Sequence, residues 1–245
     1  MIIPDPRKNR RAPYTPVGNL EIRVRRKMSC LGCVLILSCL MDPAYAEIKI
    51  TVDYHSVDTA TKDFKFPNVP TPSKDDAAAR AKLALVDGEI DSNGAGLGAL
   101  TDGLLPSMED DPAANFFFNA ATMGGRFSMD LGGAIEIAQV NTYSWHPNTR
   151  GPQVYKLYAS DGADPKFNAA PGGSLDPVTC GWKLIAVVDT RPREGYGGGQ
   201  YGVSISDSSG VLGKYRYLLF SCIAPEADDD YGNTFYSEID VIEKK

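Results

Sequence analysis

The sequence predicts an all-β sandwich or barrel that is preceded by one short helix. Between residues 126 and 242, apolar positions alternate with polar ones in short segments rich in tyrosine and β-branched residues, which is typical of strands. Loops rich in glycine, proline and aspartate separate these segments, and no long helical pattern follows Leu85. Several short strands joined by such loops indicate a sandwich or a barrel. The expected strands are residues 126–131, 135–144, 154–159, 182–189, 215–222 and 235–242.

Residues 1–46 differ from the rest of the chain and predict a cleavable secretory signal. Eight basic residues precede the apolar run 30–41, and Ala44-Tyr45-Ala46 follows it. The run is shorter than the roughly 20 apolar residues that span a bilayer, so we expect no transmembrane segment after cleavage. Cleavage after Ala46 would place the mature chain, which begins at Glu47, outside the cell or in the cell envelope. Lipid attachment at Cys39 is the alternative, because Leu37-Ser38-Cys39 loosely resembles a bacterial lipoprotein signal.

Charge and cysteine content suit an exported protein. The signal holds eight of the 25 basic and three of the 31 acidic residues, so the mature chain carries a net charge of −11. That charge repels polyanions and argues against nucleic acid as a partner. Only Cys180 and Cys222 remain after cleavage, and an even pair in an oxidising compartment predicts a disulfide. Two buried thiols are the alternative.

Residues 47–84 are expected to form an N-terminal region, followed by the sandwich domain at 85–245. Residues 47–54 alternate like a strand, and residues 64–72, with three prolines, indicate an irregular linker. Ser73 and Asp76 have the spacing of a capping box, and the alanines that follow favour a short helix up to Leu85. Glycines and aspartates between Gly88 and Gly103 predict tight turns.

The order of motifs resembles the discoidin, or coagulation-factor 5/8 type C, family of galactose-binding-like domains over residues 85–242. The motifs are Leu100-Thr101-Asp102-Gly103, Phe127-Ser128-Met129-Asp130-Leu131-Gly132, Tyr155-Lys156-Leu157-Tyr158-Ala159-Ser160-Asp161-Gly162, Gly181-Trp182-Lys183-Leu184, Arg216-Tyr217-Leu218-Leu219-Phe220 and Phe235-Tyr236-Ser237-Glu238-Ile239-Asp240-Val241.

The resemblance implies a jelly-roll β-sandwich, a binding function and a structural calcium ion. Relatives bind carbohydrate, phospholipid or protein through loops at one end of the sandwich. The chain departs from the family at residues 163–180, which are longer than the usual connection, and at its two cysteines, which do not occupy the family's usual positions. The family places an aromatic at Trp182 as a packing residue, and we expect it in the core.

The calcium site is expected between the glycine-rich loop and the last strand. Calcium binds six to eight carboxylate and carbonyl oxygens, and residues 91–103 offer both. Glu238 matches the position at which a glutamate closes the site in the family, and it lies on the polar face of its strand. The expected ligands are Asp102 and Glu238, with Asn93 and Asp87 as weaker candidates; an ordinary exposed acid is the alternative for Glu238.

Two segments are candidates for ligand contact. The loop that contains Trp145, His146, Asn148 and Arg150 could offer a ring and hydrogen-bond donors to a sugar, although Trp145 could equally belong to the core. Phe116-Phe117-Phe118 cannot all face inward on a regular strand, so we expect one exposed ring or an irregular loop.

The leading hypothesis is therefore an exported, non-catalytic module that binds a glycan and holds structural calcium. The alternative is a cell-surface adhesion module of the same fold that binds protein. An enzyme ranks third, because Gly-x-Ser-x-Gly and His-Glu-x-x-His motifs are absent and the acidic runs suit solvated loops.

Overall fold

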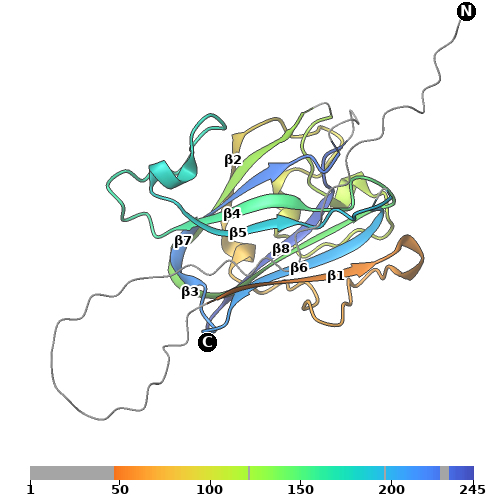
Figure 1. The fold of residues 1–245 in the computed structure, drawn as a ribbon, viewed down its shortest axis with the longest axis horizontal. Helices are drawn as coiled ribbons and strands as arrows, with labels where there is room; N and C mark the ends of the chain where they lie inside the picture. Colours follow the sequence, from red (N-terminus) through yellow and green to blue (C-terminus); the bar gives the residue numbers. More distant parts are fainter. Residues whose placement is uncertain (1–46, 121, 196, 227–231) are drawn as a thin grey trace, which may run out of the picture.

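The computed structural model describes residues 47–120, 122–195, 197–226 and 232–245, and these form two packed layers of antiparallel strands (Figure 1). The expected signal, its cleavage site and Cys39 lie outside the described residues. The eight strands are β1 (Ile48–His55), β2 (Lys82–Asp87), β3 (Gly124–His146), β4 (Val154–Ser160), β5 (Lys183–Asp189), β6 (Gly199–Asp207), β7 (Gly213–Ile223) and β8 (Tyr236–Glu243). The all-β class that the sequence predicts is confirmed.

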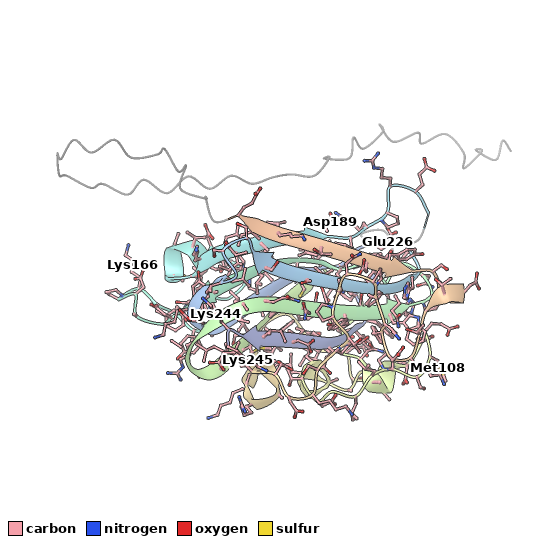
Figure 2. The ribbon with its side chains drawn as sticks, turned by 90° about the horizontal axis from the view of Figure 1, so that it is seen from below. Met108, Lys166, Asp189, Glu226, Lys244 and Lys245 are labelled. Atoms are coloured by element: carbon pink, nitrogen blue, oxygen red, sulfur yellow. The ribbon has the colours of Figure 1, made fainter. Side chains whose placement is uncertain are left out.

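Strand β3 joins the two layers because it is 23 residues long and changes partners midway. Its first half pairs with β2 and β7, and its second half pairs with β6 and β8. The pairing with β7 shifts register between Asp130 and Ile135 and ends at Ile137, where the pairing with β8 begins and the strand passes to the other layer. One layer therefore has the order β2-β3-β7-β4-β5 and the other β1-β6-β3-β8. The strands of this second layer lie side by side in Figure 2.

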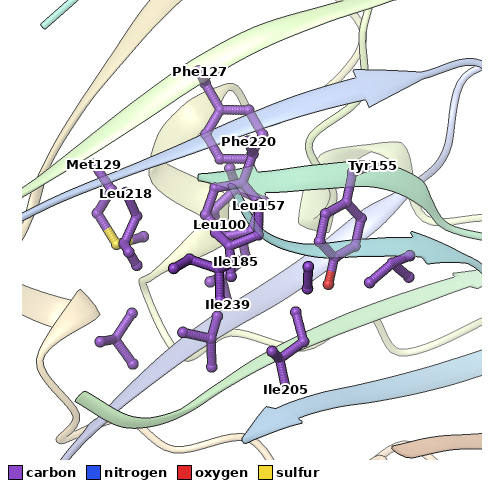
Figure 3. Packing of buried hydrophobic residues seen from close by; sticks show 14 of the residues in the cluster. Leu100, Phe127, Met129, Tyr155, Leu157, Ile185, Ile205, Leu218, Phe220 and Ile239 are labelled. Atoms are coloured by element: carbon purple, nitrogen blue, oxygen red, sulfur yellow. The ribbon is translucent and has the colours of Figure 1, made fainter. Parts of the chain in front are cut away.

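The main core fills the space between the layers (Figure 3). Because side chains alternate along a strand, each layer contributes every second residue to this core. The rings of Phe127 and Phe220 stack with their centroids 4.9 Å apart, and Ile205 and Ile239 face them from the other layer. At about 25 cal/mol per Å² of buried apolar surface, this packing supplies most of the driving force for folding.

Residues 73–85 do not form the expected helix. Ala78–Arg80 make a single 3₁₀ turn, and the chain then continues as β2. Leu83 pairs with Met129 and packs against the core, so the strand buries apolar surface that a short isolated helix would leave in water. The Asp76 carboxylate accepts hydrogen bonds from the Ala78 and Val241 backbone N–H groups at 2.7 and 2.8 Å, which ties this segment to β8.

The remaining described helices are 3₁₀ turns of three or four residues, so that none could span a membrane. Their bounds are Val57–Thr59, Leu97–Leu100, Pro112–Ala114 and Pro177–Cys180.

The proline-rich linker covers the outer face of the β1-β6-β3-β8 layer. Phe64, Phe66 and Val69 pack there against Tyr143 and Trp145 in a second cluster. The Phe64 ring meets the rings of Tyr143 and Trp145 edge to face, at 6.0 and 5.8 Å. The N-terminal region is thus packed onto the sandwich along its length.

The long connection between β4 and β5 folds over the outer face of the other layer. Trp182 is 3% exposed and packs with Tyr158 and Leu219, which confirms it as a packing residue. Phe167 lies between the rings of Trp182 and Tyr217, with centroids 5.3 and 4.8 Å away.

The expected disulfide is wrong, because the two cysteines are free thiols on opposite faces of one layer. Cys222 belongs to the main core, whereas Cys180 packs beside Trp182 on the outer face. Successive residues of a strand point to opposite faces, so the sheet itself separates the two sulfur atoms.

The three consecutive phenylalanines are all buried in an irregular segment, which is the second of the two expected outcomes. Phe116 and Phe118 enter the main core, and Phe117 stacks on Phe235 with centroids 4.1 Å apart. The segment makes single bridges to Ile90 and Tyr236 instead of a regular strand, so a second apolar surface can receive the middle ring.

Candidate functional site

The loop after β3 and the loop before β6 meet at one end of the sandwich. A side-chain carbon at Gly198 would lie 1.9 Å from the Pro147 carbonyl oxygen and 2.9 Å from the Asn148 nitrogen, so the two loops touch at a glycine. Glycine is the residue that permits such a close backbone approach. This contact places the predicted ligand loop beside Gly198, directly before β6.

Two of the predicted ligand residues point into the protein. Trp145 is 5% exposed and its ring lies in the cluster beneath the linker, which corrects the expectation that it offers a face to a sugar. His146 is 1% exposed. Its Nδ1 accepts a hydrogen bond from the Asn148 backbone N–H at 3.1 Å, and its Nε2 is buried without a partner, 3.8 Å from the Asp110 carboxylate.

Burial, together with the nearby Arg150 charge, lowers the pKa of His146 to about 4. The imidazole is therefore neutral near pH 7. With Nδ1 acting as acceptor, the hydrogen of the neutral ring resides on Nε2. His146 thus organises the loop from beneath by holding the Asn148 backbone.

The other two predicted residues lie at the surface. Asn148 is exposed, and Arg150 is half-buried with its guanidinium 4.6 Å above the centre of the Phe235 ring. The cation–π contact fixes the direction of the arginine while its N–H donors remain near solvent. Of the predicted loop, Asn148 and Arg150 are the groups that can reach a ligand.

A hollow of about 320 Å³ lies beside this loop and is called the Tyr54 pocket below. Tyr54, on β1, is 50% exposed, and its hydroxyl donates to the Gly198 carbonyl at 2.8 Å. The ring packs at 4.9 Å against Tyr201, whose hydroxyl donates to the Gly197 carbonyl. The pocket is lined by Val52, Tyr54, Thr190, Pro192, Glu194, Gly197, Gly198 and Tyr201.

Sequence reasoning missed the Tyr54 pocket. The alternation of β1 does carry a signal, because Ile50, Val52 and Tyr54 share one face and all three are at least 39% exposed. Only the tertiary structure brings that face to Thr190, Pro192 and Gly198.

The predicted metal residues Glu238 and Asp102 lie close together on the outer face of β8. The Glu238 Oε2 atom accepts a hydrogen bond from the Gly103 N–H at 2.9 Å, while its Oε1 atom is buried without a partner. Burial raises the pKa of Glu238 to about 9, and the charges of Asp240, Asp102 and Asp76 add to the effect. A buried, unpartnered carboxylate oxygen among other acids fits a cation.

Asp240 supports the same region from beneath. It is fully buried, and it accepts hydrogen bonds from the Ser73 N–H at 3.1 Å and the Tyr143 hydroxyl at 3.1 Å. Burial raises its pKa to about 6. Tyr143 also donates to the Pro70 carbonyl, so the linker closes over these acids.

The weaker metal candidates make their contacts elsewhere. The Asn93 side chain donates to Asp91, and the Asp87 carboxylate lies against Gly173 of the long connection. Among the described residues, no three histidine, cysteine or acidic side chains are grouped closely enough to hold a metal by themselves. A calcium ion at Glu238 would therefore need backbone carbonyl oxygens as further ligands.

No protein-family model matches the sequence, and no curated protein is significantly similar to it. The fold is similar to several solved structures. A fucose binding module from Streptococcus pneumoniae, SpX-3, is 14% identical with a TM-score of 0.43 over 69% of this chain and 98% of that one. CBM32-1 from a family 31 glycoside hydrolase of Clostridium perfringens is 11% identical with a TM-score of 0.42 over 69% and 99%. The structure of SpGH29 is 14% identical with a TM-score of 0.40, and this chain spans 28% of its length.

Proposed function

We propose that this chain is an exported, non-catalytic module that binds carbohydrate at the Tyr54 pocket and holds calcium as a structural ion. The observation that carries the proposal is the half-exposed ring of Tyr54 at one end of the β-sandwich. A hydrogen bond from its hydroxyl group to the Gly198 carbonyl holds the ring in place.

The chemistry of the pocket suits a sugar. Saccharides present an apolar ring face and a rim of hydroxyl groups, so their sites combine an aromatic surface with a few directed polar groups. Tyr54 supplies the surface, and the side chains of Thr190 and Glu194 line the same hollow. Asn148 and Arg150 add donors from the adjoining loop, whose backbone touches Gly198.

The pocket favours binding over catalysis. Hydrolysis of a glycosidic bond uses two carboxyl groups that face each other across the bond. Among the described residues that line the Tyr54 pocket, Glu194 is the only acid. The paired acids Glu238 and Asp240 are at most 1% exposed and lie beneath the linker, where a glycan could not reach them.

A protein ligand is the second candidate function. Ile50 and Val52 are 39% and 45% exposed and continue the apolar surface of the pocket along the edge strand β1. An edge strand with exposed apolar side chains can also receive a protein partner.

A glycan array and two variants of one residue separate these functions. Wild-type protein should bind neutral glycans on the array. Tyr54→Ala should weaken binding about tenfold or more, because the stacked ring is lost. Tyr54→Phe keeps the ring and should retain most of the affinity. An array without signal, or equal binding by Tyr54→Ala, would contradict the sugar site and leave the protein partner as the better hypothesis.

Calcium would bind at Glu238 and Asp102, because the Oε1 atom of Glu238 is buried without a hydrogen-bond partner and could serve as a ligand. An ion that binds only the folded state raises its stability by mass action. Calcium added to chelated protein should raise the Tm, and Glu238→Gln should remove that rise. Asp87→Asn is the matched control and should keep it. A wild-type Tm indifferent to calcium would exclude the ion from this account.

Export rests on residues 1–46. Expression of the full chain in a bacterial host, followed by N-terminal sequencing of the exported protein, should yield Glu47 as the first residue. A product that begins at a lipidated Cys39, or that retains residues 28–46, would refute this cleavage.

A further inference from the structure

A second hollow, of about 280 Å³, lies at the other end of the sandwich and is called the Lys183 pocket below. It forms where β4 ends and β5 begins. Figure 2 shows Lys166, in the connection between these strands, at one edge of the molecule and away from Asp189, the last residue of β5. Thr190, which follows Asp189, lines the Tyr54 pocket. The side chains that give the hollow its character are Asp161, Asp164, Val178, Trp182, Lys183 and Tyr215.

One wall of this pocket comes from the long connection, residues 161–182, and that wall is clamped to the sheet by Arg126. The Nη1 atom of Arg126 donates to the carbonyl oxygens of Pro171, Gly172 and Leu175, at 2.8–2.9 Å. Its Nε atom donates to the Ser221 hydroxyl of β7 at 3.2 Å. A guanidinium that holds three carbonyls fixes the path of a segment that would otherwise be a free loop.

Aromatic packing fixes the same wall a second time. The Trp182 indole N–H donates to the Asn168 carbonyl at 2.8 Å, and Phe167 packs between Trp182 and Tyr217. Gly181 has a φ of +78° and lies so close to Phe167 that a side-chain carbon there would be 2.9 Å from its Cα atom. The wall is therefore rigid before any ligand arrives, which lowers the entropic cost of binding.

The polar groups of the pocket offer both donors and acceptors. The Lys183 Nζ atom donates to the Tyr215 hydroxyl oxygen at 3.1 Å, which leaves the hydroxyl hydrogen free to donate elsewhere. The Oδ1 atoms of Asp161 and Asp164 accept from the Ala163 and Lys166 N–H groups, and their Oδ2 atoms remain available as acceptors. Val178, 54% exposed, adds an apolar rim.

This set of groups selects the class of ligand. Two carboxylates against one ammonium group oppose an anion. A simple cation would meet the ammonium group of Lys183. Hydroxyl groups of a neutral sugar can donate to the carboxylates and accept from Lys183 and Tyr215 at once. The Tyr215 and Val178 side chains provide apolar contact for the ring, and Trp182, which is 3% exposed, lies in the wall behind them, where its signal can report on binding.

We propose that the Lys183 pocket is a second saccharide site, specific for a neutral sugar residue, so that the module can engage glycans at both of its ends. This inference rests on the proposed function of the chain as a carbohydrate-binding module. It assigns a binding role to the connection between β4 and β5, which has no part in the Tyr54 pocket.

The two tryptophans of the chain allow a direct test. Protein of residues 47–245 labelled with 5-fluorotryptophan has two ¹⁹F signals, which Trp145→Phe assigns. The probe is an equimolar mixture of the methyl glycosides of galactose, N-acetylgalactosamine, fucose, glucose and N-acetylglucosamine. We expect the Trp182 signal to shift saturably, with a Kd of about 1 mM for so small a ligand. Lys183→Ala combined with Asp164→Ala should abolish the shift, whereas Tyr54→Ala should keep it.

Lys214→Ala combined with Asp58→Ala is the control of matched charge, because both residues are exposed and neither lines the Tyr54 pocket or the Lys183 pocket. It should behave as wild type. A Trp182 signal that stays fixed at saturating glycoside overturns the second site. So does a shift that survives Lys183→Ala with Asp164→Ala. If the second site fails but glycan-array binding depends on Tyr54, the proposed carbohydrate-binding function stands without the second site. A blank array together with a fixed Trp182 signal would refute both the proposed function and the second site.

Discussion

Buried His146 should make the stability of this protein depend on pH in a definite window. Its pKa is lowered to about 4 in the folded state, by burial and by the charge of Arg150, from 6.5 in an unfolded chain. When the pKa of a group is lower in the folded state than in the unfolded state, the group contributes stability at any pH above its unfolded pKa. This contribution is lost as the pH falls from the unfolded pKa through the folded pKa. The difference of about 2.5 units corresponds to about 3 kcal/mol, lost between pH 6.5 and pH 4.

The variant His146→Asn isolates this contribution. Asparagine offers an oxygen that can accept the Asn148 N–H in place of Nδ1, and it does not titrate. The variant will lose some packing against the Phe235 ring, whose centroid is 4.7 Å away, but that cost is the same at every pH. Urea unfolding at several pH values between 4 and 7 gives the free energy of unfolding of both proteins. The free energy of unfolding of the wild type, relative to that of His146→Asn, should fall by about 3 kcal/mol between pH 7 and pH 4.

Asp110 supplies an internal control. Its charge favours protonation of His146, so Asp110→Asn should lower the pKa of the histidine further.

If the imidazole were hydrated or paired in solution, the free energies of unfolding of the wild type and of His146→Asn would depend on pH in the same way. That result would refute the assignment of His146 as a buried neutral group.

The other predictions concern packing and covalent state. Trp145→Ala should cost about 3 kcal/mol or more of folding free energy by urea unfolding, because its ring lies in the cluster with Phe64; a loss below about 1 kcal/mol would return Trp145 to the surface. Non-reducing mass spectrometry should find Cys180 and Cys222 as free thiols, and dithiothreitol should leave the Tm unchanged; a mass two hydrogens lower would contradict the structure. Arg126→Met should make the connection between β4 and β5 the first site of proteolysis, since three carbonyl contacts are lost; an unchanged cleavage pattern would show that the aromatic contacts suffice.

Local alternation in the sequence was enough to predict β1, β4, β5, β7 and β8. It gave the single strand β3 as two strands and missed β2 and β6. The motif of residues 235–241 has the apolar and polar faces expected of β8, with Ile239 in the core and Glu238 on the other face. Side chains along a strand alternate by geometry alone, so the facing of Glu238 follows from its neighbours. Trp182, by contrast, was placed among packing residues by the family resemblance, and the structure buries it.

Features that depend on packing against a distant segment could not be predicted from the sequence. The alanines of residues 77–84 favour a helix by propensity, yet pairing with β3 makes β2, because Leu83 finds Met129 and the core only as part of a strand. Trp145 looked like a ligand contact because nothing local reveals that the linker with Phe64 folds back over it. The disulfide failed for a related reason, since a sheet lies between the two sulfur atoms.

By itself, the sequence determined the all-β class, the position of most strands and the polar face on which Glu238 lies, because these follow from short-range periodicity and residue chemistry. Only the tertiary structure decided what covers each face. It buried Trp145 and His146, left Tyr54 half exposed beside Gly198, and built the Lys183 pocket from a connection clamped by Arg126. Burial depends on segments distant in the chain, and their packing is a property of the folded molecule that no local pattern encodes.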